Sequence, residues 1–127
     1  MHRRRAIGGI VIGTMIGLLV SSAWAAPPPQ VQREIEQLID AMGQSGCEFQ
    51  RNGTWYPAGQ ARAHLRRKYD YLRKRDLVDS AEQFIERAGT QSSMSGKPYA
   101  VRCAGQGTVP SAQWLAARLS KLRHATP

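Results

Sequence analysis

Apolar residues recur with helical spacing in four segments of the chain. In the first, residues 30–42, one helical face carries Val31, Ile35, Leu38, Ile39 and Met42. We expect Gly43 to end this helix. Similar spacing predicts helices over residues 57–75, 79–88 and 111–123. At the start of the third, Asp79 followed by Glu82 has the form of a capping box.

Shorter segments between these helices carry strand patterns. Residues 47–50 alternate apolar with polar, residues 54–56 are β-prone, and residues 98–103 form a further β-prone run. Asn52-Gly53 separates the first two segments and predicts a hairpin with a type I′ turn, which needs positive φ at both central residues. The order of elements predicts an α+β fold with about four helices and a small three-stranded antiparallel sheet.

The first 25 residues follow the pattern of a cleavable signal peptide. Three arginines at positions 3–5 precede an apolar run over residues 6–20, and Ala23-Trp24-Ala25 provides a small-x-small cleavage site. The alternative, an uncleaved anchor, needs about 20 apolar residues, and this run is shorter and contains four glycines. We therefore expect cleavage near Ala25 and a periplasmic protein without a transmembrane anchor. After cleavage, residues 26–29 would form a proline-rich lead-in and residues 30–123 a single domain.

The positive net charge of the chain favours anionic binding partners. The 127-residue chain has a formal charge of +9, and residues 26–127 retain 15 basic and 9 acidic residues. In the cytoplasm such an excess would suggest nucleic acid. An exported protein instead meets lipopolysaccharide phosphates, cell-wall carboxylates and other envelope proteins, so we expect partners of that kind and no nucleic acid. The alternative is that the charge only keeps the protein soluble.

The two cysteines, Cys47 and Cys103, predict one structural disulfide. An even number of cysteines in an oxidising compartment favours pairing. A redox-active pair would have the C-x-x-C spacing, which is absent here. Two cysteines and isolated histidines do not form a ligand cluster, so we expect neither a metal nor another cofactor.

The second predicted helix is the most basic part of the chain. Its buried stripe is expected to contain Ala61, Leu65, Tyr69 and Leu72. Arg62, Arg66 and Arg73 fall together in another direction, and with Lys74 they are expected to point outward; we call these four residues the cationic ridge. We expect the ridge to provide most contacts to an anionic partner.

Further binding candidates lie beside the apolar stripe and in two loops. His64 and Lys68 are one helical turn apart at the edge of the stripe, and Arg51 can approach them from the hairpin. Lys97, in the loop that precedes the last predicted strand, is a fourth candidate for anion binding.

Four motifs give the chain a family resemblance. They are Cys47-x-Phe49-x-Arg51-Asn52-Gly53, Ala61-x-x-His64-Leu65-x-x-Lys68-Tyr69, Ser80-Ala81-Glu82-x-Phe84-Ile85, and Ser92-Ser93-x-Ser95-Gly96-Lys97-Pro98-Tyr99 leading to Cys103. With these motifs the chain resembles the YfeK-like proteins, small exported proteins of Gram-negative bacteria that are classed as a domain of unknown function. The resemblance implies a periplasmic single domain with a shared disulfide, and it implies no reaction.

Catalysis would depend on His64 together with Ser93 or Ser95. The serine-rich loop lacks the first glycine of a phosphate-binding P-loop, because Gln91 occupies that position. It also lacks the serine of a Ser-x-x-Lys motif, because Met94 stands there. We therefore expect a non-enzymatic envelope binding module. The alternative is a small hydrolase or transferase that uses His64 and a serine of the Ser92–Ser95 loop, which requires a contact of about 3 Å between them.

Overall fold

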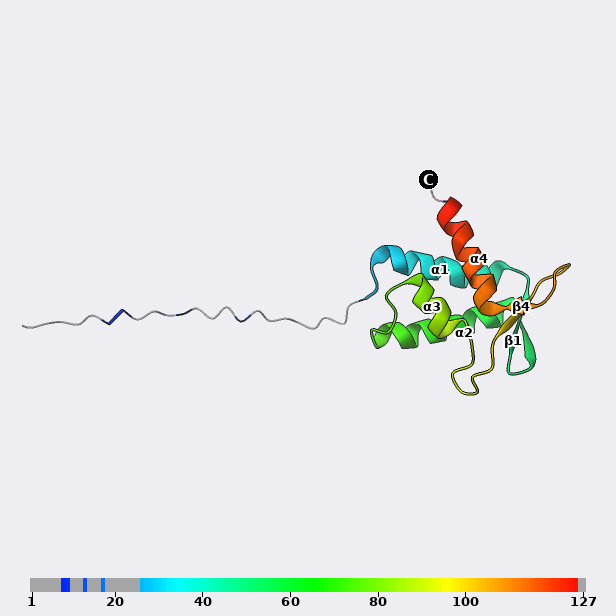
Figure 1. Cartoon of the computed structure of the whole chain (residues 1–127), viewed down its shortest axis with the longest axis horizontal. Helices are drawn as coiled ribbons and strands as arrows, with labels where there is room; N and C mark the ends of the chain where they lie inside the picture. The colour runs from blue at the N-terminus through cyan, green and yellow to red at the C-terminus, as the bar shows by residue number, and fades with distance from the viewer. Residues whose placement is uncertain (1–7, 10–12, 14–16, 18–25, 126–127) are drawn as a thin grey trace, which may run out of the picture.

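The computed structural model describes residues 8–9, 13, 17 and 26–125. The expected signal peptide, residues 1–25, therefore lies outside the described residues except for four glycines. Along the chain the elements are α1 (Pro29–Gln44), β1 (Glu48–Arg51), β2 (Thr54–Pro57), α2 (Ala58–Lys74), α3 (Ala81–Ala88), β3 (Ala100–Arg102), β4 (Val109–Pro110) and α4 (Ser111–Ala125) (Figure 1). No helix within the described part combines the length and hydrophobicity needed to cross a membrane.

The sheet has four antiparallel strands in the order β2-β1-β3-β4. The α+β class and the four helices are confirmed, but the sheet has one strand more than the three expected. The additional strand, β4, pairs Val109 with Val101 and Pro110 with Ala100. Two residues are too few to show an alternating pattern, so only the pairing with β3 makes this segment a strand.

The hairpin between β1 and β2 forms as predicted. Asn52 and Gly53 have φ values of 50° and 81°, the two positive values that a type I′ turn requires. The register pairs Arg51 with Thr54 and Phe49 with Tyr56. Because side chains alternate along a strand, Phe49 and Arg51 point to the same side of the sheet.

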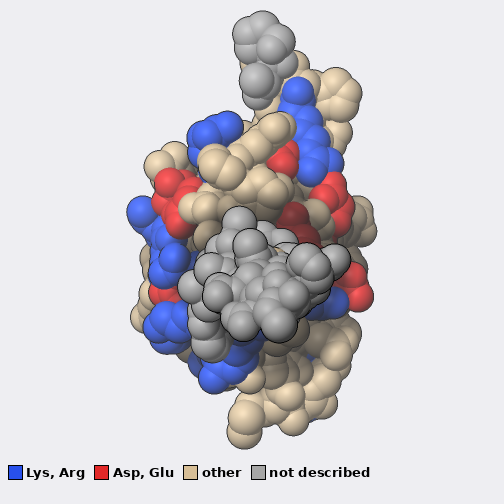
Figure 2. Space-filling model, turned by 90° about the vertical axis from the view of Figure 1, so that its left-hand side faces the viewer, with Lys and Arg blue, Asp and Glu red and all other residues tan. Residues whose placement is uncertain are grey.

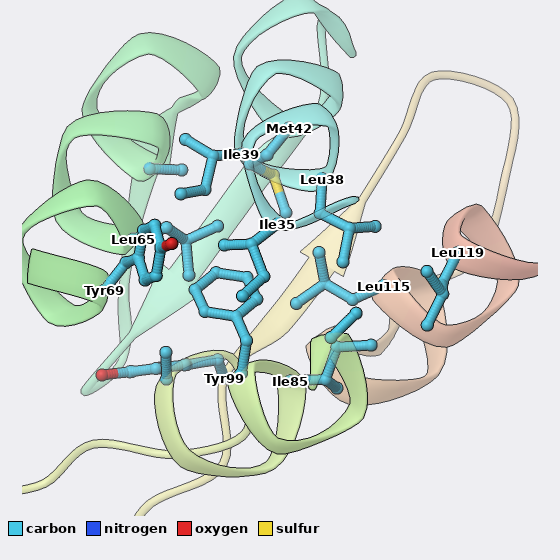
Figure 3. Packing of buried hydrophobic residues seen from close by; sticks show 14 of the residues in the cluster. Ile35, Leu38, Ile39, Met42, Leu65, Tyr69, Ile85, Tyr99, Leu115 and Leu119 are labelled. Atoms are coloured by element: carbon cyan, nitrogen blue, oxygen red, sulfur yellow. The ribbon is translucent and has the colours of Figure 1, made fainter. Parts of the chain in front are cut away.

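Four helices bury one side of the sheet. Helix α2 contacts β1 and β2, and α4 contacts β3 and β4, while α1 and α3 pack against these two helices. The core they enclose is shown in Figure 3. Its largest fully buried side chains include Tyr99, Phe49, Phe84, Ile35, Leu38, Ile39, Met42, Leu65 and Leu115.

Gly43 does not end α1, contrary to the sequence-based expectation. The helix continues to Gln44 and is followed by Ser45. A Cβ atom at Gly43 would overlap the side chain of Arg62 on α2. The missing side chain therefore lets two helices approach each other closely, which sequence alone does not distinguish from a helix stop.

The cap of α3 lies one residue later than the capping box predicted. Ser80, not Asp79, is the N-cap, and its side chain accepts a hydrogen bond from the Gln83 backbone N–H at 3.1 Å. The Gln83 side chain in turn accepts from the Asp79 N–H at 2.7 Å. Gln83 thus performs the reciprocal role that the pattern assigned to Glu82.

The predicted disulfide between Cys47 and Cys103 is present. Cys47 precedes β1 and Cys103 follows β3, next to the paired residues Glu48 and Arg102. Arg102 donates to both carboxylate oxygens of Glu48, at 3.0 and 3.2 Å. The bond therefore holds together the two central strands of the sheet.

Candidate functional site

Most of the cationic ridge is paired with carboxylates. The ion pairs are Arg62–Asp40 at 3.0 Å, Arg66–Glu36 at 2.6 Å and Arg73–Asp70 at 3.0 Å. Two of these three acids belong to α1, which lies beside α2. Lys74, the fourth ridge residue, has no carboxylate partner among the described residues. On the face seen in Figure 2, basic and acidic side chains likewise lie next to one another.

A second group of cations lines a cleft between the β1–β2 hairpin, α2 and the loop that follows α3. The cleft consists of three adjoining hollows of about 210, 390 and 520 Å³, each bordered by Arg51 and His64. Its basic residues are Arg51, Arg67, Lys68 and Arg87. The described residues that line these hollows include no aspartate or glutamate. The site therefore suits an anion rather than a metal ion, and no metal-binding cluster occurs among the described residues.

A chain of hydrogen bonds connects the polar residues of the cleft. Arg51 Nη1 lies 2.8 Å from His64 Nδ1, and His64 Nε2 lies 2.9 Å from the Tyr99 hydroxyl. Lys68 Nζ donates to the same hydroxyl at 3.2 Å and to the backbone oxygen of Gln91 at 3.0 Å. A guanidinium can only donate, so His64 Nδ1 accepts and Nε2 carries the hydrogen.

Local structure explains how these side chains meet. Arg51 is the last residue of β1, and His64 and Lys68 are one turn apart on α2. Tyr99 is 1% exposed, and its backbone N–H donates to the oxygen of Thr90 at 2.9 Å. Its ring contacts the His64 ring edge-on, with centroids 5.5 Å apart. Helix, hairpin and loop thus each provide part of the site.

The electrostatics of the cleft show an excess of positive charge. Burial, followed by the charges of Arg51, Lys68 and Arg67, lowers the pKa of His64 from 6.5 to about 4. Burial and the charge of Arg51 also lower the pKa of Lys68, while burial raises the pKa of Tyr99 against the opposing effect of Arg51. At neutral pH the cleft therefore holds a neutral imidazole and a neutral phenol beside its cations.

The low pKa of His64 predicts a pH dependence of stability. Between about pH 6.5 and the folded-state pKa of about 4, the unfolded chain binds a proton that the folded chain rejects. The unfolding free energy should therefore fall as pH falls through this window, by about 1–2 kcal/mol after screening by solvent. Urea unfolding of the wild type and His64→Gln over this range measures the effect. The variant should lose this part of the slope, and equal slopes would contradict the prediction.

The serine-rich loop is organised by its own hydrogen bonds. Ser92 Oγ accepts from the backbone N–H groups of Met94 and Ser95, both at 3.3 Å. Ser95 Oγ donates to Asn52 Oδ1 at 2.5 Å, which ties the loop to the tip of the hairpin. Both segments extend from the same side of the molecule (Figure 1). These contacts build one wall of the cleft.

The serine candidates do not contact the histidine. Both ring nitrogens of His64 are engaged, by Arg51 and by Tyr99, and no hydrogen bond among the described residues joins His64 to Ser93 or Ser95. Ser93 is exposed and borders two of the hollows. The catalytic alternative therefore lacks, in this arrangement, the contact by which a base would activate a serine.

Of the predicted binding residues, the structure brings Arg51, His64 and Lys68 together. Lys97 lies outside the residues that border the three hollows. Sequence reasoning did not assign Arg67, Arg87 or Tyr99 to the site. The spacing of Arg67, one turn after His64 on the predicted helix, is a signal that could have found it, whereas the contribution of Arg87 depends on how α3 packs.

Comparison with known proteins places the chain in a family. Residues 29–123 match the model of a family of unknown function (DUF5329). The chain belongs to this family. It is 36% identical over 91 residues to the uncharacterized protein YfeK of Salmonella typhimurium, which covers 71% of this chain and 74% of that protein. No solved structure matches the chain. The family assignment agrees with the resemblance seen in the motifs and carries no activity with it.

Proposed function

We propose that this protein is a periplasmic binding module without enzymatic activity, and that its cleft binds an anionic group of an envelope component such as lipopolysaccharide or the cell wall. The observation that carries the proposal is the convergence of Arg51, Arg67 and Lys68 on a cleft bordered by no described carboxylate. The N-terminal sequence pattern and the disulfide support export.

The cleft is better suited to bind an anion than the ridge is. A ligand at Arg62 or Arg66 must compete with a carboxylate already within 3.0 Å. The cations of the cleft have no such competitor within the part of the chain that the structure describes. The lowered pKa of Lys68 shows that its charge is disfavoured by burial and by Arg51. A bound anion would offset this repulsion. Anion binding would therefore stabilise the charged form of Lys68.

Loss of one cleft cation should abolish most of the binding. Arg51→Gln removes a charge-assisted donor, which reduces affinity by about tenfold or more. Immobilised lipopolysaccharide and, separately, cell-wall sacculi are the probes, used at low salt because exposed charges are screened beyond about 8 Å at physiological ionic strength. Retention of the wild type should fall steeply as salt is added.

Arg73→Gln is the matched control, because it removes the same charge from the ridge. It should retain nearly all binding, since Arg73 is already paired with Asp70. Equal losses in the two variants would show that only net charge matters and would contradict a specific site. Absence of retention of the wild type on both materials would refute the proposed function.

A further inference from the structure

The hydroxyl of Tyr99 has a hydrogen without an acceptor. Its oxygen accepts from His64 Nε2 at 2.9 Å and from Lys68 Nζ at 3.2 Å. Neither neighbour can reverse its role, because an ammonium only donates and Arg51 fixes the histidine tautomer. Among the described residues, no acceptor forms a hydrogen bond with the Tyr99 O–H. This half-buried network is therefore incomplete until something else accepts that hydrogen.

The position of the hydroxyl makes it available to a ligand. The Tyr99 ring lies at the edge of the core with its oxygen directed away from the other labelled side chains (Figure 3). Tyr99 borders the hollow of about 390 Å³ together with Arg51 and Lys68. An acceptor placed in this hollow would complete the network and lie beside two cations.

The chemistry of the site restricts which ligand fits. Arg51 and Lys68, the two cations that border this hollow, can only donate. The Tyr99 oxygen already accepts twice, so it can only donate further. A ligand group that is entirely an acceptor matches such a site. A phosphate monoester has three strong acceptor oxygens and a charge of about −1.5 to −2 at neutral pH, whereas a carboxylate has two oxygens and one charge.

We infer that the cleft recognises a phosphate monoester, and that Tyr99 is the residue that makes it specific for this group. The inference rests on the proposed function, because it names the anion that the cleft would bind. The same group occurs in two sources, as a free sugar phosphate or as the headgroup of a lipid such as phosphatidic acid. Phosphate diesters carry one charge and should bind less well.

A pH profile provides a test that does not depend on a variant. The second proton of a phosphate monoester leaves at about pH 6, so affinity should rise between about pH 5 and pH 7. The titratable and charged groups that face the hollows come from five elements. They are Arg51 from β1, Tyr56 from β2, His64, Arg67, Lys68 and Tyr71 from α2, Arg87 from α3 and Tyr99 from the loop before β3. Inorganic sulfate stays doubly charged across this range, so its profile reports the protein groups alone.

The decisive experiment is an NMR titration of the exported protein, purified as the cell processes it, with glucose 1-phosphate. Tyr99→Phe should weaken binding about tenfold, because it removes the hydroxyl and leaves the ring and all cations in place. Tyr69→Phe is the matched control, since Tyr69 is also buried but does not border the cleft. The spectra of both variants also show whether each is folded.

Phosphatidylcholine vesicles that contain phosphatidic acid present the phosphate monoester as a lipid headgroup, which is the second source. Vesicles that contain phosphatidylglycerol, a phosphate diester, are the control. Binding to glucose 1-phosphate or to the phosphatidic acid vesicles supports the inference and indicates the source. Equal affinity of the wild type and Tyr99→Phe, or equal binding of monoester and diester, would overturn it while leaving anion binding intact. Retention on lipopolysaccharide or sacculi without binding to either monoester probe would also overturn it, whereas retention on neither material refutes the proposed function itself.

Discussion

Replacing Cys47 and Cys103 together with serine should lower the free energy of unfolding by about 4 kcal/mol. The bond closes a loop with a sequence separation of 56 residues, and opening that loop returns conformational freedom to the unfolded chain. Small domains have a net stability of only about 5–15 kcal/mol, so the loss is a large part of the total. Urea unfolding followed by circular dichroism measures it.

Reduction provides an independent control for this prediction. Dithiothreitol should destabilise the wild type by a similar amount and leave the double serine variant unchanged. Because β1 ends in Arg51 and Tyr99 precedes β3, loosening these strands should also weaken the proposed binding of an anion in the cleft. A loss below about 1 kcal/mol would contradict the role of the bond as a major constraint on the unfolded chain.

The second large effect is expected where α3 meets α4. Leu115 is fully buried, and Leu115→Ala should lower the unfolding free energy by about 2–5 kcal/mol because it leaves a cavity. A Cβ atom at Gly89 would overlap Leu115 Cδ1. Gly89→Ala alone should therefore cost about 1–3 kcal/mol through overpacking. In the double variant the added methyl group occupies part of the vacated space, so the combined loss should be smaller than the sum.

Chemical denaturation of the two single variants and the double variant gives the coupling between the sites. Gly59→Ala is the matched control, since a Cβ atom there meets nothing within 4 Å. Gly59 lies in α2, where alanine has the higher helix propensity, so this change should stabilise the protein by up to about 1 kcal/mol. Strict additivity at Gly89 and Leu115 would contradict the packing that the structure shows.

Local patterns in the sequence determined much of the fold. The spacing of Ile35, Leu38, Ile39 and Met42 identified the buried face of α1, because helical periodicity depends only on neighbouring residues. Asn52 and Gly53 identified the hairpin, because their backbone preferences act within the turn itself. The count of two cysteines was sufficient to pair Cys47 with Cys103 once an oxidising compartment was expected.

Contacts between distant segments decided the rest. β4 exists only because Val109 and Pro110 reach β3, and Gly43 serves the approach of α1 to α2 rather than ending a helix. Sequence spacing grouped the ridge arginines on α2, but whether Arg62 and Arg66 carry free charge depended on the acids that α1 places beside them.

The candidate site, like the fold, depended partly on local sequence patterns and partly on contacts between distant segments. Sequence spacing placed His64 and Lys68 one turn apart on α2, but it could not show that Tyr99, 35 residues from His64, completes the hydrogen-bond chain. A helix pattern reports which residues share a face, whereas a cleft forms from side chains that the packing of separate elements brings within about 3 Å of each other. The tertiary structure therefore decided which cations of the described residues lie together around a cleft without a neighbouring carboxylate.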